Sequence, residues 1–386
     1  MGEDTFKGLL KIAKEDLDVL VDAFAKSSYV VLAPVAEGEA TKFGVIGGMR
    51  IKIPHLTTRP VKELFFPQNE TLFSFDCSGK ADSTIKTPDA VTPDGVIPDA
   101  VMPDAVATDG ISPRVIMGVR PCDARALVLL DYVFASNEYK DPYYTIRREQ
   151  TVVITFACPR PGIACFCAST GGGPYDETGS DVMFMESDDS YLIKVISEKG
   201  RRLFQESLPL LKGGCSECPC VIFEADDTDI RAARDAKAAS EQLLSANCSA
   251  NVPIEAAVDT LGRSTGFSDP AWEEIYRKCL GCAVCTYLCP TCHCFDIGDE
   301  ETNDYGERVR NWDSCMFPLF TLHASGHNPR PSRKERFRQR VMHKFNYFVE
   351  ANDCIACVGC GRCVENCPVN LDIRQVLSVF AGGVFA

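Results

Sequence analysis

Two cysteine runs in the 386-residue chain have the residue types and the spacing that bind iron–sulfur clusters. The runs read Cys279-Leu-Gly-Cys282-Ala-Val-Cys285-Thr-Tyr-Leu-Cys289-Pro290 and Cys357-Val-Gly-Cys360-Gly-Arg-Cys363-Val-Glu-Asn-Cys367-Pro368. Each has the spacing C-x2-C-x2-C-x3-C-P, in which three thiolates of one tight loop bind three irons of a cubane and the fourth thiolate binds the other cluster. Zinc also binds paired C-x2-C elements, but each run here supplies three such cysteines and a Cys-Pro. The spacing therefore predicts two 4Fe-4S clusters rather than zinc.

This crossed arrangement predicts which cysteines bind each cluster. The two expected ligand sets are Cys279, Cys282, Cys285 and Cys367 for one cluster, and Cys289, Cys357, Cys360 and Cys363 for the other. Iron–sulfur cubanes pass single electrons, so two neighbouring clusters predict a function in electron transfer.

A further group of cysteines, in the first half of the chain, predicts a third iron–sulfur cluster. Its expected ligands are Cys122, Cys158, Cys165 and Cys167. Residues 114–119 and 151–156 have the composition of strands, so the first two cysteines follow strand carboxyl ends, where the ligand sites of open α/β sheets collect. The helix expected after Cys122 also points its N-terminal N–H groups toward an anionic cluster. Simple burial in an α/β core is the alternative interpretation.

Two groups of three cysteines do not complete a motif. They are Cys215, Cys218 and Cys220, and Cys292, Cys294 and Cys315. For the first group, a zinc site, a cluster completed by Cys248 and a set of surface thiols all stay open. The second group either forms another incomplete site, supplies a ligand to the third cluster, or packs behind the first cluster.

The composition restricts the class of protein. Hydrophobic residues make up 45% of the chain and charged residues 24%, which is typical of a folded globular protein. The 54 acidic and 40 basic residues give a net charge of −14, which argues against nucleic-acid binding. The 21 cysteines are an odd number and too sparse for a secreted disulfide scaffold. With no secretion signal at Met1 and no apolar run that could span a bilayer, the sequence predicts a cytoplasmic protein without a membrane span.

Helices and short strands must position the cysteines. An amphipathic helix is expected over residues 6–24, because apolar residues recur there at helical spacing, and another over 123–131. The expected strands are 29–35, 43–51, 72–75, 114–119, 151–156 and 191–196. Alternation of this kind predicts an α/β or α+β domain.

The chain is expected to have two domains. Residues 1–265 form the α/β (or α+β) domain, with a proline-rich insertion over 80–113 whose five-residue repeat prevents a helix. Residues 266–386 form a mostly helical ferredoxin-type domain that holds the two clusters.

A basic stretch over residues 330–344 lies between the two cysteine runs of this acidic chain. It allows three interpretations: a solvated helix face, compensation of cluster charge, and docking of an acidic partner. In the docking interpretation Arg336, Arg338 and Arg340 contact the partner.

Several motifs occur together in a combination that is far more specific than either cysteine run alone. They are Gly118-Val-Arg-Pro-Cys122-Asp-Ala-Arg-Ala-Leu127, Asp141-Pro-Tyr-Tyr144, Cys165-Phe-Cys167, Cys289-Pro-Thr-Cys292-His-Cys294-Phe-Asp296 and Trp312-Asp-Ser-Cys315. With the second cysteine run, they resemble the iron–sulfur subunits of cytoplasmic anaerobic oxidoreductases, a family that includes the iron–sulfur subunit of anaerobic sulfite reductase and the sulfhydrogenase beta subunit. The resemblance implies a subunit that relays electrons between a catalytic partner, of the hydrogenase, sulfite reductase or heterodisulfide reductase type, and a flavin- and NAD(P)-linked subunit.

No catalytic residues are expected in this chain. The sequence shows no nucleophile paired with a base, no H-E-x-x-H zinc motif and no paired carboxylates. Two other functions stay open: reduction of a substrate by the chain itself at an N-terminal metal or cluster site, and service as a scaffold for cluster assembly. The first predicts turnover by the isolated chain with a reduced viologen, and the second predicts labile clusters that are not reversibly reduced.

Overall fold

The computed structural model describes residues 8–46, 51, 53–76, 112–136, 138–212, 222–247, 252–302 and 305–384. The proline-rich repeat at residues 88–106 lies outside the described residues. So do Cys77, Cys215, Cys218, Cys220 and Cys248.

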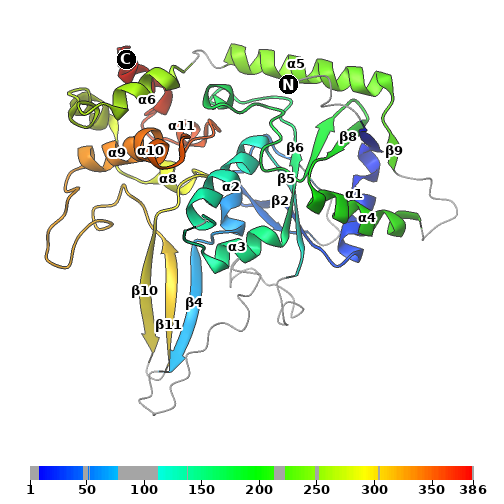
Figure 1. Cartoon of the computed structure of the whole chain (residues 1–386), viewed down its shortest axis with the longest axis horizontal. Coiled ribbons are helices and arrows are strands. Elements are labelled where there is room, and N and C mark those ends of the chain that lie inside the picture. The colour runs from blue at the N-terminus through cyan, green and yellow to red at the C-terminus, as the bar shows by residue number, and fades with distance from the viewer. Residues whose placement is uncertain are drawn as a thin grey trace.

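A mixed eight-stranded sheet forms the first part of the chain, with strand order β3-β2-β5-β6-β7-β8-β1-β9 (Figure 1). Its strands are β1 (Leu10–Ala13), β2 (Val30–Glu37), β3 (Ala40–Val45), β5 (Arg114–Val119), β6 (Thr151–Phe156), β7 (Val182–Glu186), β8 (Ser190–Val195) and β9 (Ile222–Glu224). The four strands β2, β5, β6 and β7 run parallel, and the strands outside them pair antiparallel. Every residue of β5 and β6 is buried, as expected of parallel strands that are covered on both faces.

Helices cover both faces of this sheet. They are α1 (Leu17–Lys26), α2 (Pro121–Phe134), α3 (Pro142–Glu149), α4 (Glu198–Lys212) and α5 (Asp227–Asn247). Val115 and Met117 of β5 pack with α1 and α4 on one face, whereas Ile116 packs with α2 on the other. The alternation follows from the two-residue repeat of a strand. Together these elements confirm the predicted α/β class.

The helix expected over residues 6–24 is wrong in its first part. Residues 10–13 form β1 instead, which pairs with β8 on one side and β9 on the other, and α1 begins only at Leu17. Apolar residues at 9, 10 and 13 have the spacing of one face of a helix. The segment instead forms backbone hydrogen bonds with β8 and β9, and local periodicity does not reveal such long-range partners. Of the strand expected over 43–51, residues 43–45 belong to β3 (Ala40–Val45), and residues 47–50 lie outside the described residues.

The second part of the chain is mainly helical, as predicted. Its helices are α6 (Ile254–Gly262), α7 (Trp272–Ile275), α8 (Val284–Tyr287), α9 (Arg333–Met342), a π-helical segment (His343–Tyr347), α10 (Phe348–Asn352), α11 (Arg362–Glu365) and α12 (Ile373–Phe380). Trp272 stacks obliquely on Phe380, and Phe337 and Phe345 complete the centre of this core. Ala257 and Leu261 of α6 belong to the same core, so α6 packs with the helices that follow it. The predicted domain boundary at residue 265 stays a prediction.

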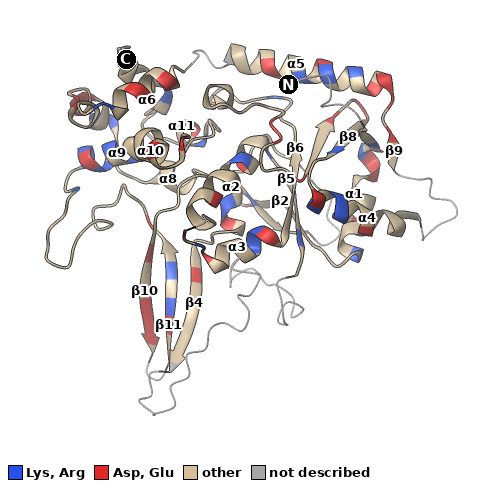
Figure 2. Ribbon diagram, in the orientation of Figure 1, with Lys and Arg blue, Asp and Glu red and all other residues tan. Residues whose placement is uncertain are grey.

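A three-stranded antiparallel sheet projects from the junction of the two parts (Figure 1). It consists of β4 (Asn69–Asp76), β10 (Phe295–Thr302) and β11 (Tyr305–Trp312), with β11 in the middle. The sequence predicts only β4 of these three strands. Acidic residues predominate on β10 and basic residues on β11 (Figure 2). At its base, Arg310 is buried and forms ion pairs with Glu70 and Asp141, so the hairpin is fixed to both β4 and the α/β part.

Among the residues that the structure describes, no helix is both long and apolar enough to span a membrane.

Candidate iron–sulfur centres

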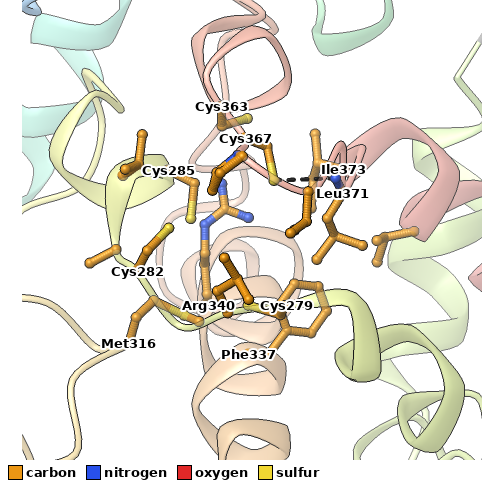
Figure 3. Close-up of a pocket in the computed structure, with 16 residues that line it drawn as sticks. Cys279, Cys282, Cys285, Met316, Phe337, Arg340, Cys363, Cys367, Leu371 and Ile373 are labelled. Carbon is orange, nitrogen blue, oxygen red and sulfur yellow. Dashed lines mark hydrogen bonds between the residues drawn. The ribbon is translucent and has the colours of Figure 1, made fainter.

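The carboxyl-terminal cysteines gather around one cavity between the two cysteine runs (Figure 3). The cysteines in its wall are Cys279, Cys282, Cys285, Cys363 and Cys367. Four of them are the ligand set that the crossed arrangement predicts for one cluster. The fifth, Cys363, belongs to the other predicted set. The structure therefore brings the two ligand sets side by side.

Cys289 lies among the cysteines of the second run. Burial raises the pKa of Cys357 to about 11 and the pKa values of Cys360 and Cys363 to about 12. Negative charge on Cys289 contributes to each of these three increases. Because such effects fall off with distance, the four sulfurs are neighbours. They are the set predicted for the second cluster.

The loops that carry these cysteines turn through left-handed residues. Gly281 has φ +73°, and its N–H lies 3.3 Å from Cys279 Sγ. Gly359 has φ +62°, and a Cβ there would lie 2.5 Å from the carbonyl carbon of Phe166. An L side chain rarely adopts such a φ, which favours glycine at both positions, and the close approach of Phe166 adds a steric reason at Gly359. These turns fold the sulfurs inward and direct backbone N–H groups at them, which tunes cluster potentials.

The predicted third ligand set also meets at one cavity. All four of its cysteines line the wall: Cys122, Cys158, Cys165 and Cys167. His55, Gly359 and Cys360 line the same cavity. Cys165 Sγ lies 3.9 Å from His55 Nε2 and 3.8 Å from the carbonyl oxygen of Cys360. The cavity therefore adjoins the second cysteine run, a proximity that the sequence did not indicate.

The group Cys292, Cys294 and Cys315 lies beside Cys289. The side chain of Cys292 hydrogen-bonds with that of Cys289, and the side chain of Cys315 hydrogen-bonds with that of Cys294. The hydrogen bond with Cys315 lowers the pKa of Cys294 to about 6. Cys292, Cys294 and Cys315 are therefore neighbours of one another and adjoin Cys289 of the first run.

Within the described part of the chain, no three His, Cys, Asp or Glu side chains close around a single metal ion. This holds for the eight cysteines of the two runs as well. The absence of a site for a single ion therefore does not distinguish cluster ligands from other cysteines.

Comparison with known proteins places the chain in a family. A family model described as a 4Fe-4S dicluster domain matches residues 278–371. Sulfhydrogenase 2 subunit beta of Pyrococcus furiosus is 34% identical over 271 residues, which are 70% of this chain and 75% of that protein. The chain belongs to the sulfhydrogenase beta subunit family. Its dicluster domain provides two 4Fe-4S clusters, which accept and donate single electrons when bound.

The cavity of this sulfhydrogenase beta family member has the charge that suits such clusters. Arg340 is buried in the wall among the cysteine side chains (Figure 3). Its Nε has no hydrogen-bond partner among the residues that the structure describes. Burial opposes the charge, yet the thiolates of Cys285 and Cys363 hold the pKa of Arg340 well above its usual value. A buried cation with an unpaired N–H needs an anionic partner, and a cubane with thiolate ligands meets that need.

Two buried lysines place further positive charge beside Cys289. Lys344 Nζ lies 3.4 Å from Cys289 Sγ and donates to Thr291 Oγ1 at 2.8 Å and to the Ala356 carbonyl at 3.0 Å. Lys62 Nζ donates to the Cys292 carbonyl at 2.8 Å, and burial lowers the pKa of Lys62 to about 8. Sequence reasoning missed Lys62, because it is 230 positions from its partner and stands in no motif.

These positions show that Arg336, Arg340 and Lys344 of the basic stretch are not part of a solvated or docking face, whereas Arg333 is exposed. Arg336 and Arg340 are buried, and Arg336 Nε donates to the Met316 carbonyl at 3.1 Å. Of the three arginines expected to contact a partner, only Arg338 is partly exposed, and it stacks on Phe267. Compensation of cluster charge is the interpretation that the burial of Arg340 and Lys344 favours.

Proposed function

We propose that the chain is the electron-transfer subunit of a hydrogenase-type complex. It relays single electrons between two other subunits, one linked to flavin and NAD(P) and one catalytic. The similarity to a protein named as a sulfhydrogenase subunit supports the complex. The observation that carries the relay is Cys363, which lines the cavity of the first ligand set while belonging to the second. Two clusters whose ligands share a wall are close enough for an electron to pass between them.

The proposed ligands are the two crossed sets, with Cys279, Cys282, Cys285 and Cys367 for one cluster and Cys289, Cys357, Cys360 and Cys363 for the other. Within this arrangement the protein supplies fixed thiolates, buried cations and an apolar wall. Arg340 lies where its charge acts on both sets, since Cys285 and Cys363 both raise its pKa. The placement of this charge lets one residue influence the potentials of both clusters.

The test is metal analysis of the full chain purified without oxygen. We expect at least about eight irons and eight acid-labile sulfides per chain, as two cubanes require, with visible absorption that dithionite bleaches and a mediator restores. Cys282→Ser should remove about four irons and leave the rest. Stoichiometric zinc without labile sulfide, or clusters that cannot be reversibly reduced, would overturn the proposal.

The proposed partners are tested by isolating the complex. Affinity purification from anaerobically grown cells should recover the chain with two further subunits, one that contains flavin and one that is catalytic and contains metal. If the chain alone turns over substrate with a reduced viologen, the assignment as a relay is wrong.

A further inference from the structure

We infer that the cavity lined by Cys122, Cys158, Cys165 and Cys167 binds a third iron–sulfur cluster. The inference deepens the proposed relay and rests on it only for the use of the cluster, not for its ligands. It starts from a convergence: three segments that are separate in the sequence bring four thiols to one wall. Four thiolates are the usual ligand set of a cubane.

The sheet explains how the first two thiols meet. Strands β5 and β6 are parallel neighbours, so their carboxyl ends lie at the same edge of the sheet. Cys122 follows β5 in the first turn of α2, and Cys158 follows β6 by two residues. Cys122 also lies at the positive end of the dipole of α2, which favours an anion in the cavity.

Arg120 holds the walls of the cavity in place. Its guanidinium is buried and donates to the Pro54 carbonyl at 2.6 Å and 3.2 Å and to the His55 carbonyl at 2.8 Å. It donates as well to the Ala157 carbonyl at 2.7 Å, next to Cys158. The residue therefore ties the segment of His55 to the end of β6 and leaves its positive charge at the cavity. A rigid wall and a fixed cation are features of a preformed site for an anionic group.

The cavity is joined directly to the second cysteine run. The Phe166 N–H, between two of the four cysteines, donates to the Gly359 carbonyl at 2.8 Å. Cys165 Sγ lies 3.8 Å from the carbonyl oxygen of Cys360, a residue proposed to bind the second cluster. A zinc ion would be redox-inert here, whereas an iron–sulfur cluster would continue the series of redox groups into the α/β part of the chain.

Cys354 is a half-buried cysteine in the same region. It packs in the same apolar cluster as Cys122 but lines neither this cavity nor the one between the two cysteine runs. Packing against this apolar cluster therefore does not by itself bring a thiol to the wall. Cys354 also provides a matched control for substitution.

The experiment compares full-length chains that are produced anaerobically and reconstituted with iron and sulfide. The wild type should hold about twelve irons per chain, and the double variant Cys122→Ser, Cys165→Ser about eight. The variant Cys354→Ser should hold as many irons as the wild type. The eight irons that remain in the double variant also show that it folds. If it loses all its iron instead, the single variant Cys167→Ser replaces it and should again lose about four.

The possible outcomes separate this inference from the proposed relay. A wild type with about eight reducible irons, or a double variant with as many irons as the wild type, overturns the third cluster and leaves the relay intact. Binding of one zinc in place of about four irons at these cysteines overturns it as well. A chain that lacks even the first eight irons contradicts the relay itself.

Discussion

The ion pair between Arg362 and Asp123 should control how firmly the second cysteine run is held against the α/β part. Arg362 follows Gly361 in that run, and Asp123 follows Cys122 in α2. The guanidinium donates to both carboxylate oxygens, at 2.6 Å and 2.8 Å, and to the Thr57 carbonyl at 2.9 Å. Both charged side chains are at most 2% exposed. Arg362→Met would leave the Asp123 carboxylate buried without its partner.

Removing one partner of a buried pair costs about 3–5 kcal/mol, because the remaining charge is uncompensated. With an m-value of about 3 kcal/mol/M, the urea midpoint should fall by roughly 1 to 1.7 M. If the two parts separate locally, the open fraction rises by roughly two to three and a half orders of magnitude, and iron release to a chelator accelerates accordingly. The double variant Arg362→Met, Asp123→Leu should recover most of the loss, since an apolar pair of similar volume is tolerated.

The assay is an anaerobic urea titration followed by near-ultraviolet circular dichroism, together with the rate of iron release. Arg308→Met is the control: Arg308 binds Asp299 with the same two-bond geometry, at 2.7 Å and 2.8 Å, but on an exposed hairpin. Exposed pairs contribute little, so its midpoint should match the wild type. A midpoint for Arg362→Met equal to that of Arg308→Met, or a double variant no more stable than the single one, would refute the reasoning.

Two further substitutions test the turns and the charges around the clusters. Gly359→Ala places a Cβ 2.5 Å from the Phe166 carbonyl carbon and 2.6 Å from the Cys167 nitrogen, so iron per chain should fall. The control Gly382→Ala, at φ +93° but with nothing within 4 Å of the new Cβ, should keep its iron. Equal iron content in both variants would contradict the steric argument. Lys344→Met removes a buried positive charge 3.4 Å from Cys289 Sγ. The reduced form of the cluster proposed to bind Cys289 then loses stabilisation, so the reduction potential of that cluster should fall. The fall should be at most about 170 mV, the value for unit charges about 4 Å apart at an effective dielectric constant of about 20. The control is Lys334→Met, because Lys334 is a partly exposed lysine of α9 that pairs with Glu273. This variant should leave the reduction potential unchanged in a redox titration. Equal potentials in the two variants would exclude a role for Lys344.

Local sequence signals predicted the features that depend on neighbouring residues. The bounds of β5 and β6 agree with the expected strands at 114–119 and 151–156, because continuous β-branched runs suit strands buried on both faces. The cysteine spacing predicted two clusters, and the dicluster domain confirms them. The identity of the ligands remains a prediction, since spacing alone does not place a sulfur.

Long-range partners could not be predicted in the same way. An exposed face was one interpretation of the basic stretch, but Arg340 and Lys344 are buried beside cysteines from distant segments. Charge density along the chain does not distinguish a solvated cation from one that is paired in the interior. Lys62 lies in a short 3-10 helix, Val61–Leu64, and nothing in its local sequence shows that it reaches Cys292.

The pairing of β4 with β11 has a consequence for the synthesis of the chain. Asn69 on β4 hydrogen-bonds to Asn311 on β11, 242 positions later. At about 5–20 residues per second, a ribosome needs roughly 12 to 48 s to make the residues between them. During that time β4 has left the ribosome without the strand that it pairs with, and its edge is open to other chains. A nascent chain with such an unpaired strand would be a natural substrate for a chaperone until the hairpin of β10 and β11 emerges.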